Sequence, residues 1–321
     1  MKFVRSIRDD WGRICLARFI IDRFFSIVLT LAAVITLTFF MMHAVPGGPF
    51  AQDKEIPPEV VKALEAKYHL DEPLYKQYLN YIKGFLTWNL GPSFQKIGVS
   101  VNDIIKQSMP TSLKLGCVTM IFVLLLGLPA GMLSAVRRDT FSDYLIRFIA
   151  TLGQTIPSFV LATLLIYIFS TKLKVLPTFG LRTWKHYVLP VVALGGYSLS
   201  FVVRLVRSSM LEALGQDYIR TARAKGVPEF QVFFKHALRN SLIPVVTYIG
   251  PLIATVITGS FVVEKIFAIP GMGKFFVDSI TNRDYTVLMG LTVLSAALLC
   301  AATLIVDLLY GLIDPRIRVD K

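Results

Sequence analysis

The residues of this chain best suited to a specific task form a basic segment from Tyr218 to Gly226, which reads Tyr-Ile-Arg-Thr-Ala-Arg-Ala-Lys-Gly. Most of its residue types favour helix, and Gly226 followed by Pro228 is typical of one helix ending and another beginning. A helix closed by such a turn is poorly suited to binding a small solute. It is well suited to being held by another protein, which predicts that this chain takes its energy from a partner.

The remaining polar groups are not arranged for catalysis. The sequence has neither Gly-x-Ser-x-Gly nor His-Glu-x-x-His. The segment Gly271-Met-Gly273-Lys274 is followed by Phe275 and lacks the spacing of a phosphate-binding loop. We therefore predict no enzymatic activity and no cofactor on this chain.

A metal site has one candidate, Met41-Met42-His43, because thioether and imidazole groups bind soft or borderline ions. Such a site would favour nickel as cargo, but methionines at the end of an apolar stretch are more often packing groups, and no metal site is predicted. The other histidines, which share no ligand spacing, are His69, His186 and His236. The cysteines, which we expect to be buried thiols, are Cys15, Cys117 and Cys300.

Composition indicates an integral membrane protein. Of 321 residues, 54% are hydrophobic and only 17% are charged, and the mean hydropathy is +0.61. The net charge is +13, but the basic residues are spread over short loops beside apolar stretches, as in membrane proteins. No nucleic-acid partner is predicted.

Six apolar stretches are long enough to cross a bilayer as helices. They lie at about 20–43, 113–136, 145–170, 187–207, 241–263 and 288–313. The fourth is diluted by Gly195-Gly196 and several serines, so it must be packed inside a bundle. We expect the first to be an uncleaved helix, and residues 111–321 to form the membrane core that contains the other five.

Basic residues set the predicted orientation. Residues 1–19 form a basic segment that places the N-terminus in the cytoplasm, and six spans return the C-terminus to the same side. This segment is either a short helix in the headgroup layer or a disordered tail. Residues 44–110 then lie outside the cell, where helix-like patterns beginning at Pro57 and Pro73 predict a small helical insertion.

The cytoplasmic loop 208–240 is too long for a simple turn. Its first part, Ser208 to Lys225, predicts an amphipathic helix with these residues on one face: Leu211, Leu214, Tyr218 and Ala222. A second helix after Pro228 is predicted by another set of apolar residues: Phe230, Phe233, Phe234 and Leu238. The product is a helix–turn–helix, in which small residues allow close approach by a partner: Ala222, Ala224 and Gly226.

Four separated segments closely resemble the permeases of peptide-type ATP-binding-cassette (ABC) importers. They are His43-Ala-Val-Pro-Gly47; Tyr218 to Gly226 with His236-Ala-Leu-Arg-Asn240 and Ile243-Pro244; Val263 to Gly273 with Asn282-Arg-Asp-Tyr285; and Asp307 to Arg316. Arg220-Thr221-Ala222 stand where the general permease pattern has Glu-Ala-Ala. The resemblance covers nearly the whole chain beyond residue 20.

The resemblance implies an all-α, six-helix type I importer membrane domain in a prokaryotic inner membrane. It implies these ATPase-docking residues: Tyr218, Arg220, Thr221, Ala222, Arg223, Ala224, Lys225, Gly226 and Pro228. It further implies a second permease, two ATPases that bind ATP and its magnesium ion, an external solute-binding protein and a di- or oligopeptide cargo. Nickel, glutathione or a glycoside is the alternative cargo. An ATP-independent secondary transporter is the rival class, but we find no repeated half with interrupted helices.

Other polar or flexible residues within the spans have structural interpretations. Asp307 is expected to pair with Arg204 or Arg207, although an intramembrane acid can also be functional. Glu264 and Lys265 are expected at the membrane interface. Gly127 to Gly131 is a Gly-x-x-x-Gly helix-packing pattern. Four prolines in the spans are expected to mark kinks: Pro129, Pro157, Pro190 and Pro251.

Overall fold

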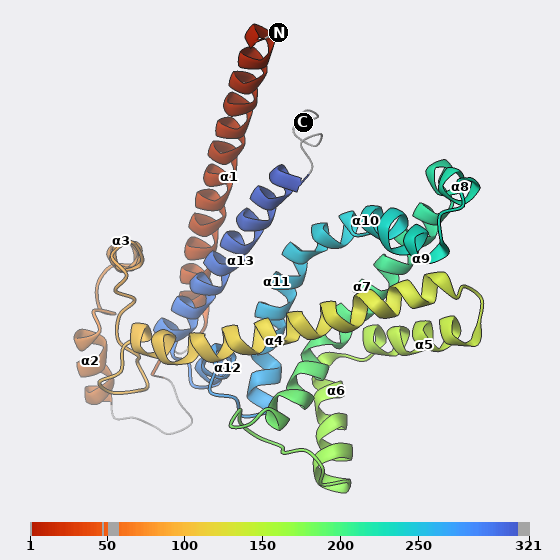
Figure 1. Cartoon of the computed structure of the whole chain (residues 1–321). Helices are drawn as coiled ribbons and strands as arrows, with labels where there is room; N and C mark the ends of the chain where they lie inside the picture. Colours follow the sequence, from red (N-terminus) through yellow and green to blue (C-terminus); the bar gives the residue numbers. More distant parts are fainter. Residues whose placement is uncertain (1, 47, 51–57, 314–321) are drawn as a thin grey trace. The chain divides into compact units, whose positions relative to one another are not determined.

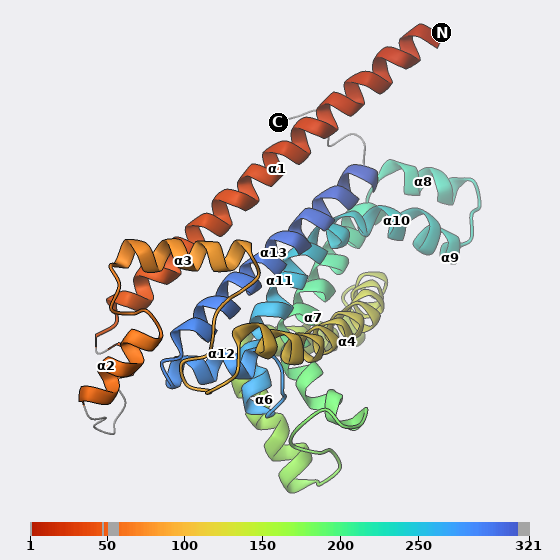
Figure 2. The same ribbon diagram turned by 90° about the vertical axis from the view of Figure 1, so that its left-hand side faces the viewer.

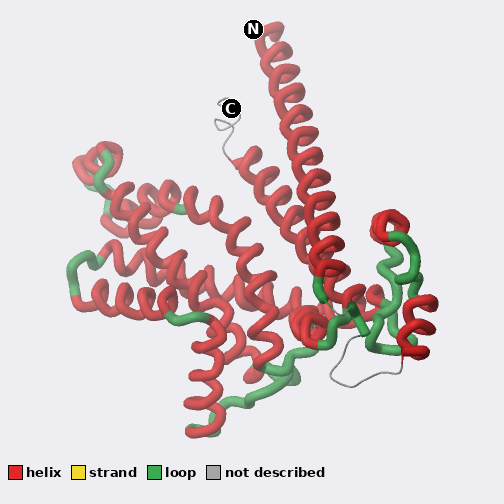
Figure 3. Tube along the Cα trace, turned by 180° about the vertical axis from the view of Figure 1, so that it is seen from behind, coloured by secondary structure: helices red, strands yellow, loops and turns green. Residues whose placement is uncertain are grey.

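The computed structural model describes residues 2–46, 48–50 and 58–313. Within these ranges the chain is built from helices and loops, without a sheet (Figure 3). The helices are α1 (Lys2–Ala44), α2 (Pro58–Lys67), α3 (Leu74–Leu86), α4 (Val101–Val136), α5 (Phe141–Thr155), α6 (Ser158–Leu165), α7 (Lys185–Leu214), α8 (Asp217–Ala224), α9 (Glu229–Gln231), α10 (Leu238–Ser241), α11 (Ile243–Ile266), α12 (Met272–Thr281) and α13 (Tyr285–Ile313) (Figure 1). Two π-helical segments, η1 (Ile166–Lys172) and η2 (Val232–Ala237), follow α6 and α9.

The predicted spans correspond to helices, with changes at their ends. Four described helices are long and apolar enough to cross a membrane, and the pair α5 and α6–η1 would be a fifth. The remaining expected span is α11, which has 24 residues. The first helix runs without interruption from residue 2, so its basic segment is not a separate headgroup-layer helix. The second span belongs to a 36-residue helix that begins at Val101, twelve residues earlier than its apolar stretch suggested.

The third predicted span is bent. Two helices, Phe141–Thr155 and Ser158–Lys172, meet at an angle of 108°. Pro157 occupies the break, where its fixed φ of −56° and missing N–H group end one helix and begin the next. The span expected over residues 145–170 is therefore broken into two helices, and the kink expected at Pro157 is confirmed.

The chain divides into two compact units, one of residues 1–107 and 275–321 and the other of residues 108–274. In the first unit, α1 packs along α13 (Figure 2). The helices predicted in the insertion are present as α2 and α3, and α3 packs on α1 through Tyr78. The Tyr78 hydroxyl lies 2.7 Å from the hydroxyl of Thr36, and its ring centroid lies 5.3 Å from that of Phe39.

The second unit is organised around α7. The pair Gly195-Gly196, which dilutes the apolar character of this span, lies where neighbouring side chains come closest. A Cβ atom on Gly195 would lie 3.2 Å from side chains of α4, and one on Gly196 would lie 3.1 Å from Leu161 of α6. The prediction that this span packs inside a bundle is confirmed, because over half of its most apolar window is buried.

The Gly-x-x-x-Gly pattern of α4 also packs against α7. A Cβ atom on Gly127 would lie 2.9 Å from Val202, and one on Gly131 would lie 2.6 Å from Val206 and 2.7 Å from the carbonyl oxygen of Val203. These distances leave no room for a methyl group, so the two glycines permit close backbone approach. The predicted helix-packing role of this pattern is confirmed.

Candidate functional site

The basic segment from Tyr218 to Gly226 forms most of helix α8 and the turn that closes it. The amphipathic helix expected over Ser208 to Lys225 is two helices, because α7 ends at Leu214 and α8 begins only at Asp217. From Pro228 the chain folds back through α9, η2 and α10 (Figure 2). The helix–turn–helix is therefore present, and it is separated from α7 by a break at residues 215–216.

The break changes which residues of α8 face inward. Ile219 and Ala222 are buried in a small cluster with Met210, Val232 and Ala237. Tyr218 is 40% exposed, although we expected it to share one helix face with Ala222. Its hydroxyl oxygen accepts a hydrogen bond from the side-chain amide of Asn240 at 2.9 Å. Ala222, which we expected to face a partner, instead belongs to the core that holds the two helices together.

The turn after α8 has the expected left-handed glycine. Gly226 has a φ of +74°, and a Cβ atom placed there would have no other atom within 4 Å. Arg223 and Glu229 close the turn through two parallel hydrogen bonds of 2.8 and 3.2 Å. Both side chains are about half exposed, so this ion pair contributes at most about 1 kcal/mol, and it mainly orients the turn.

Eight of the nine predicted docking residues are exposed on this helix–turn–helix, with Ala222 the exception: Tyr218, Arg220, Thr221, Arg223, Ala224, Lys225, Gly226 and Pro228. The structure adds two exposed aromatic residues on the second part of the same helix–turn–helix. Phe230 and Phe234 are 69% and 48% exposed, and their ring centroids are 4.4 Å apart. Their spacing of four residues was visible in the sequence, where we used both only to predict the second amphipathic helix. The surface thus combines basic groups with an exposed aromatic pair.

Glu264 is buried rather than interfacial. Its side chain accepts a hydrogen bond from the backbone N–H of Gly273 at 2.7 Å, and a Cβ atom on Gly271 would lie 2.3 Å from its carboxylate. The neighbouring N–H of Met272 donates to the hydroxyl of Ser112 at 2.8 Å. Two backbone N–H groups of this glycine-rich segment are thus used inside the protein. The glycines provide space for a carboxylate, not for a phosphate.

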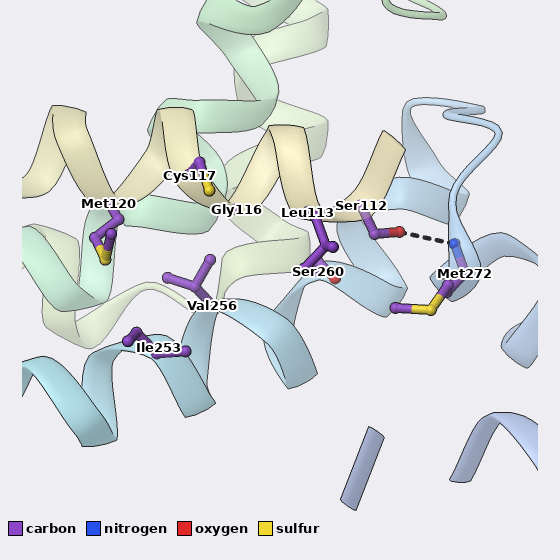
Figure 4. A pocket seen from close by; sticks show the side chains of 9 residues that line it. All are labelled: Ser112, Leu113, Gly116, Cys117, Met120, Ile253, Val256, Ser260 and Met272. Carbon is purple, nitrogen blue, oxygen red and sulfur yellow. Dashed lines mark hydrogen bonds between the residues drawn. The ribbon is translucent and has the colours of Figure 1, made fainter. Parts of the chain in front are cut away.

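A cavity of about 150 Å³ lies next to this segment, between α4 and α11 (Figure 4). Its residues are mostly apolar: Ser112, Leu113, Gly116, Cys117, Met120, Ile253, Val256, Ser260 and Met272. Ser112, Ser260 and Met272 gather at one end in Figure 4. Cys117 is exposed and lines this cavity, so the prediction of a buried thiol is wrong at this position.

In the first unit, two of the sequence motifs come together. The guanidinium group of Arg283 donates to the carbonyl oxygens of Pro46 and Gly48 at 2.9 and 3.4 Å. The next residue, Asp284, is buried and accepts hydrogen bonds from the Phe94 backbone N–H at 3.1 Å and from the Ser93 hydroxyl. These contacts fix the loops between helices. Arg283 and Asp284 thus have structural roles in this unit.

Two further expectations concern single polar residues. The Asp307 carboxylate lies 3.1 Å from the guanidinium group of Arg23, so the expected ion pair is present. Its partner is Arg23, and the expected partners Arg204 and Arg207 are wrong. The ring nitrogens of His43 lie 2.8 Å from the carbonyl oxygen of Phe39 and 3.1 Å from the side-chain oxygen of Gln77. Both nitrogens of this imidazole are therefore engaged with protein oxygens, and its role here is structural.

Comparison with known proteins gives consistent similarities. Residues 127–319 match the family described as binding-protein-dependent transport system inner membrane component, and residues 16–116 match the N-terminal region of such components. The chain is 48% identical to the dipeptide transport system permease protein DppB of Bacillus subtilis, over 95% of this chain and 99% of that protein. It is 43% identical to the oligopeptide transport system permease protein OppB of Haemophilus influenzae, over 94% and 99%.

A solved structure has the same fold. The chain resembles an inward-facing structure of the MetNI methionine ABC transporter with a TM-score of 0.57, over 66% of this chain and 96% of that one. The two sequences are only 19% identical, so this similarity concerns the arrangement of helices alone.

Proposed function

Because this chain belongs to the family of binding-protein-dependent transport system inner membrane components, we propose that it is the permease subunit of an ATP-driven importer of di- and oligopeptides. Its fold is that of an all-α ABC importer membrane domain. Its peptide cargo is supported by the names of relatives that are 48% and 43% identical over nearly their full length. Nickel, glutathione and glycosides are the cargoes against which this proposal is tested.

The observation that carries the proposal is the exposed helix–turn–helix at the end of α7. Its core is closed by Ile219 and Ala222, so it can keep its shape without a partner. It exposes Arg220 and Lys225 on its first part and the aromatic pair Phe230 and Phe234 on its second part. Exposed aromatic and arginine side chains are typical of binding surfaces, and the open space around Gly226 allows a partner to approach the backbone closely.

We assign this surface to the docking of an ABC ATPase subunit on the cytoplasmic side. The basic residues around α8 and in the N-terminal segment favour that side. Closure of two ATPases on ATP would then displace this helix–turn–helix and the equivalent loop of a second permease. The two membrane domains would open alternately to each side of the inner membrane, with both termini of this chain in the cytoplasm. An external solute-binding protein would deliver the peptide.

The cavity between α4 and α11 is the candidate contact for cargo within this subunit. Its walls are apolar, and Ser112 and Ser260 supply hydroxyl groups at one end. A volume of about 150 Å³ is enough for one side chain of a peptide, not for a whole peptide. A site of this kind would bind weakly and accept varied side chains, which suits passage rather than retention.

The proposal is tested by reconstituting the chain in proteoliposomes with the second permease, ATPases and binding protein encoded beside it. Peptide-loaded binding protein is expected to stimulate ATP hydrolysis and to drive accumulation of labelled peptide. Nickel, glutathione and glycosides are offered in parallel. If one of these compounds stimulates ATP hydrolysis and peptides do not, that compound is the cargo and the proposed peptide cargo is wrong. If uptake proceeds without the ATPase subunits, the protein is a secondary transporter.

A further inference from the structure

The most completely bound carboxylate in the described part of the second unit is that of Asp143, near the start of α5. Its side chain is fully buried, and it accepts hydrogen bonds from two guanidinium nitrogens of Arg207 at 2.9 and 2.8 Å. The hydroxyl of Ser134 donates at 2.5 Å, and the backbone N–H of Asp139 donates at 3.0 Å. No sequence pattern pointed to Asp143, and Arg207 was expected to be a partner of Asp307.

The donors come from different elements. Ser134 lies in the last turn of α4, Asp139 lies in the turn between α4 and α5, and Arg207 lies in α7 two turns before its end. A second arginine, Arg147, lies 3.6 Å from the same carboxylate but belongs to α5 itself. The Asp143 carboxylate thus joins the ends of three helices, and only the Arg207 contact reaches α7.

This junction lies directly beside the core of the helix–turn–helix. Ser134 precedes Ala135, and Arg207 is three residues before Met210. Both Ala135 and Met210 belong to the buried cluster that contains Ile219 of α8. A force applied to α8 therefore reaches α4 and α7 through this cluster, at the level where the Asp143 carboxylate ties both helices to α5.

We propose that Asp143 is a positioning residue that joins the ends of α4, α5 and α7 into one rigid base for the helix–turn–helix. When a partner displaces α8, the three helices move together, so that the displacement reaches the membrane-spanning part without being absorbed at the junction. This inference rests on the proposed function, because it assigns Asp143 a role in transmitting work from the ATPase to the helices.

A variant that separates rigidity from folding is needed, because removing one member of a buried ion pair leaves an uncompensated charge and destabilises the fold. The double variant Asp143→Asn/Arg207→Met removes both charges. The asparagine oxygen can still accept from the N–H of Asp139, while the link to α7 is lost. The matched control is Arg147→Gln, which removes an arginine from the same carboxylate without affecting a contact between helices.

The experiment uses the complete transporter in proteoliposomes and measures labelled peptide imported per ATP hydrolysed. The double variant is expected to assemble and to hydrolyse ATP, with the import ratio reduced by about tenfold, within the usual range of coupling between distant sites. Arg147→Gln is expected to keep the wild-type ratio. If the double variant assembles correctly and still imports as much peptide per ATP hydrolysed as the wild type, the proposal is overturned. The ion pair would then contribute to stability alone and would not be needed for coupling.

Spin labels provide a readout that does not depend on transport. Cysteines replace Phe141 at the exposed start of α5 and Ser208 on α7, in a chain whose three native cysteines are replaced by serine. The distance between the labels is expected to be narrow and equal with and without ATP in the wild type, and broadened in the double variant. A wild-type distance that changes with ATP would refute the rigid base.

The two readouts distinguish the possible failures. If the wild type imports no peptide, the proposed function fails, while the label distances still decide whether the three helices move as one body. If the double variant does not insert, Arg207→Lys takes its place, since lysine keeps the charge and loses the two parallel hydrogen bonds. A wild-type distance distribution in that variant would then refute the proposal, and a broadened one would support it.

Discussion

Gly226 provides the sharpest test of the docking surface. Asparagine tolerates the left-handed conformation better than other residues that have a side chain, and Gly226 has a φ of +74°. A Cβ atom at this position meets no atom of the chain itself within 4 Å. We therefore expect Gly226→Asn to change the free energy of unfolding by less than about 1 kcal/mol. At a closely packed interface the same side chain would cost about 1–3 kcal/mol, which weakens binding by about 5- to 150-fold.

The measurement compares the affinity of a fluorescent ATPase subunit for wild-type and variant permease in nanodiscs, together with the thermal stability of each permease. Gly180→Asn is the matched control, because Gly180 has a φ of +86° and equally open surroundings but lies outside the helix–turn–helix. Its ATPase affinity should equal that of the wild type. Unchanged affinity and normal peptide uptake in Gly226→Asn would show that this turn does not contact the ATPase.

Three further predictions concern packing and the cavity. Gly131→Ala should lower stability by about 1–3 kcal/mol, because its Cβ atom would lie 2.6 Å from Val206; an unchanged melting temperature in detergent would contradict the close packing of α4 on α7. Asp284→Ala should cost about 1–3 kcal/mol for each buried donor left unpaired, such as the Ser93 hydroxyl, and equal chemical stability of variant and wild type would argue against this loop anchor. Cys117, as the single cysteine of an otherwise cysteine-free chain, should react with maleimide in the assembled transporter and react more slowly when peptide is being transported; identical rates with and without peptide would exclude the cavity as a cargo contact.

The class of the protein and the existence of the helix–turn–helix could be predicted from the sequence because both depend on local patterns. Apolar stretches of about twenty residues specify helices that can cross a bilayer, whatever they pack against. The turn at Gly226 is equally local, since glycine reaches a left-handed φ at little cost and Pro228 can begin a helix. The packing role of Gly127 and Gly131 was also predictable, because their spacing places both on one side of a helix.

The orientation of α8 was not predictable in the same way. A continuous helix from Ser208 would place Tyr218 on the same face as Leu211 and Leu214. The break at residues 215–216 rotates the following turn, so Ile219 and Ala222 face inward and Tyr218 lies at the edge. The sequence did carry a signal for this break, because Gly215 caps the end of α7 and both glycine and Asp217 are poor helix formers. How far the break rotates α8 becomes evident only when α8 is seen packed against the end of α7.

The amino-acid sequence by itself determined that this chain is a bundle of membrane-crossing helices with a basic turn closed by glycine, since these properties follow from side-chain type and spacing. The tertiary structure alone decided how the charges are paired. Arg207 binds Asp143, 64 residues away, and Asp307 binds Arg23. In a chain with many basic residues, composition permits many pairs for each buried acid, and only the packing of the helices determines which guanidinium group comes within hydrogen-bond distance.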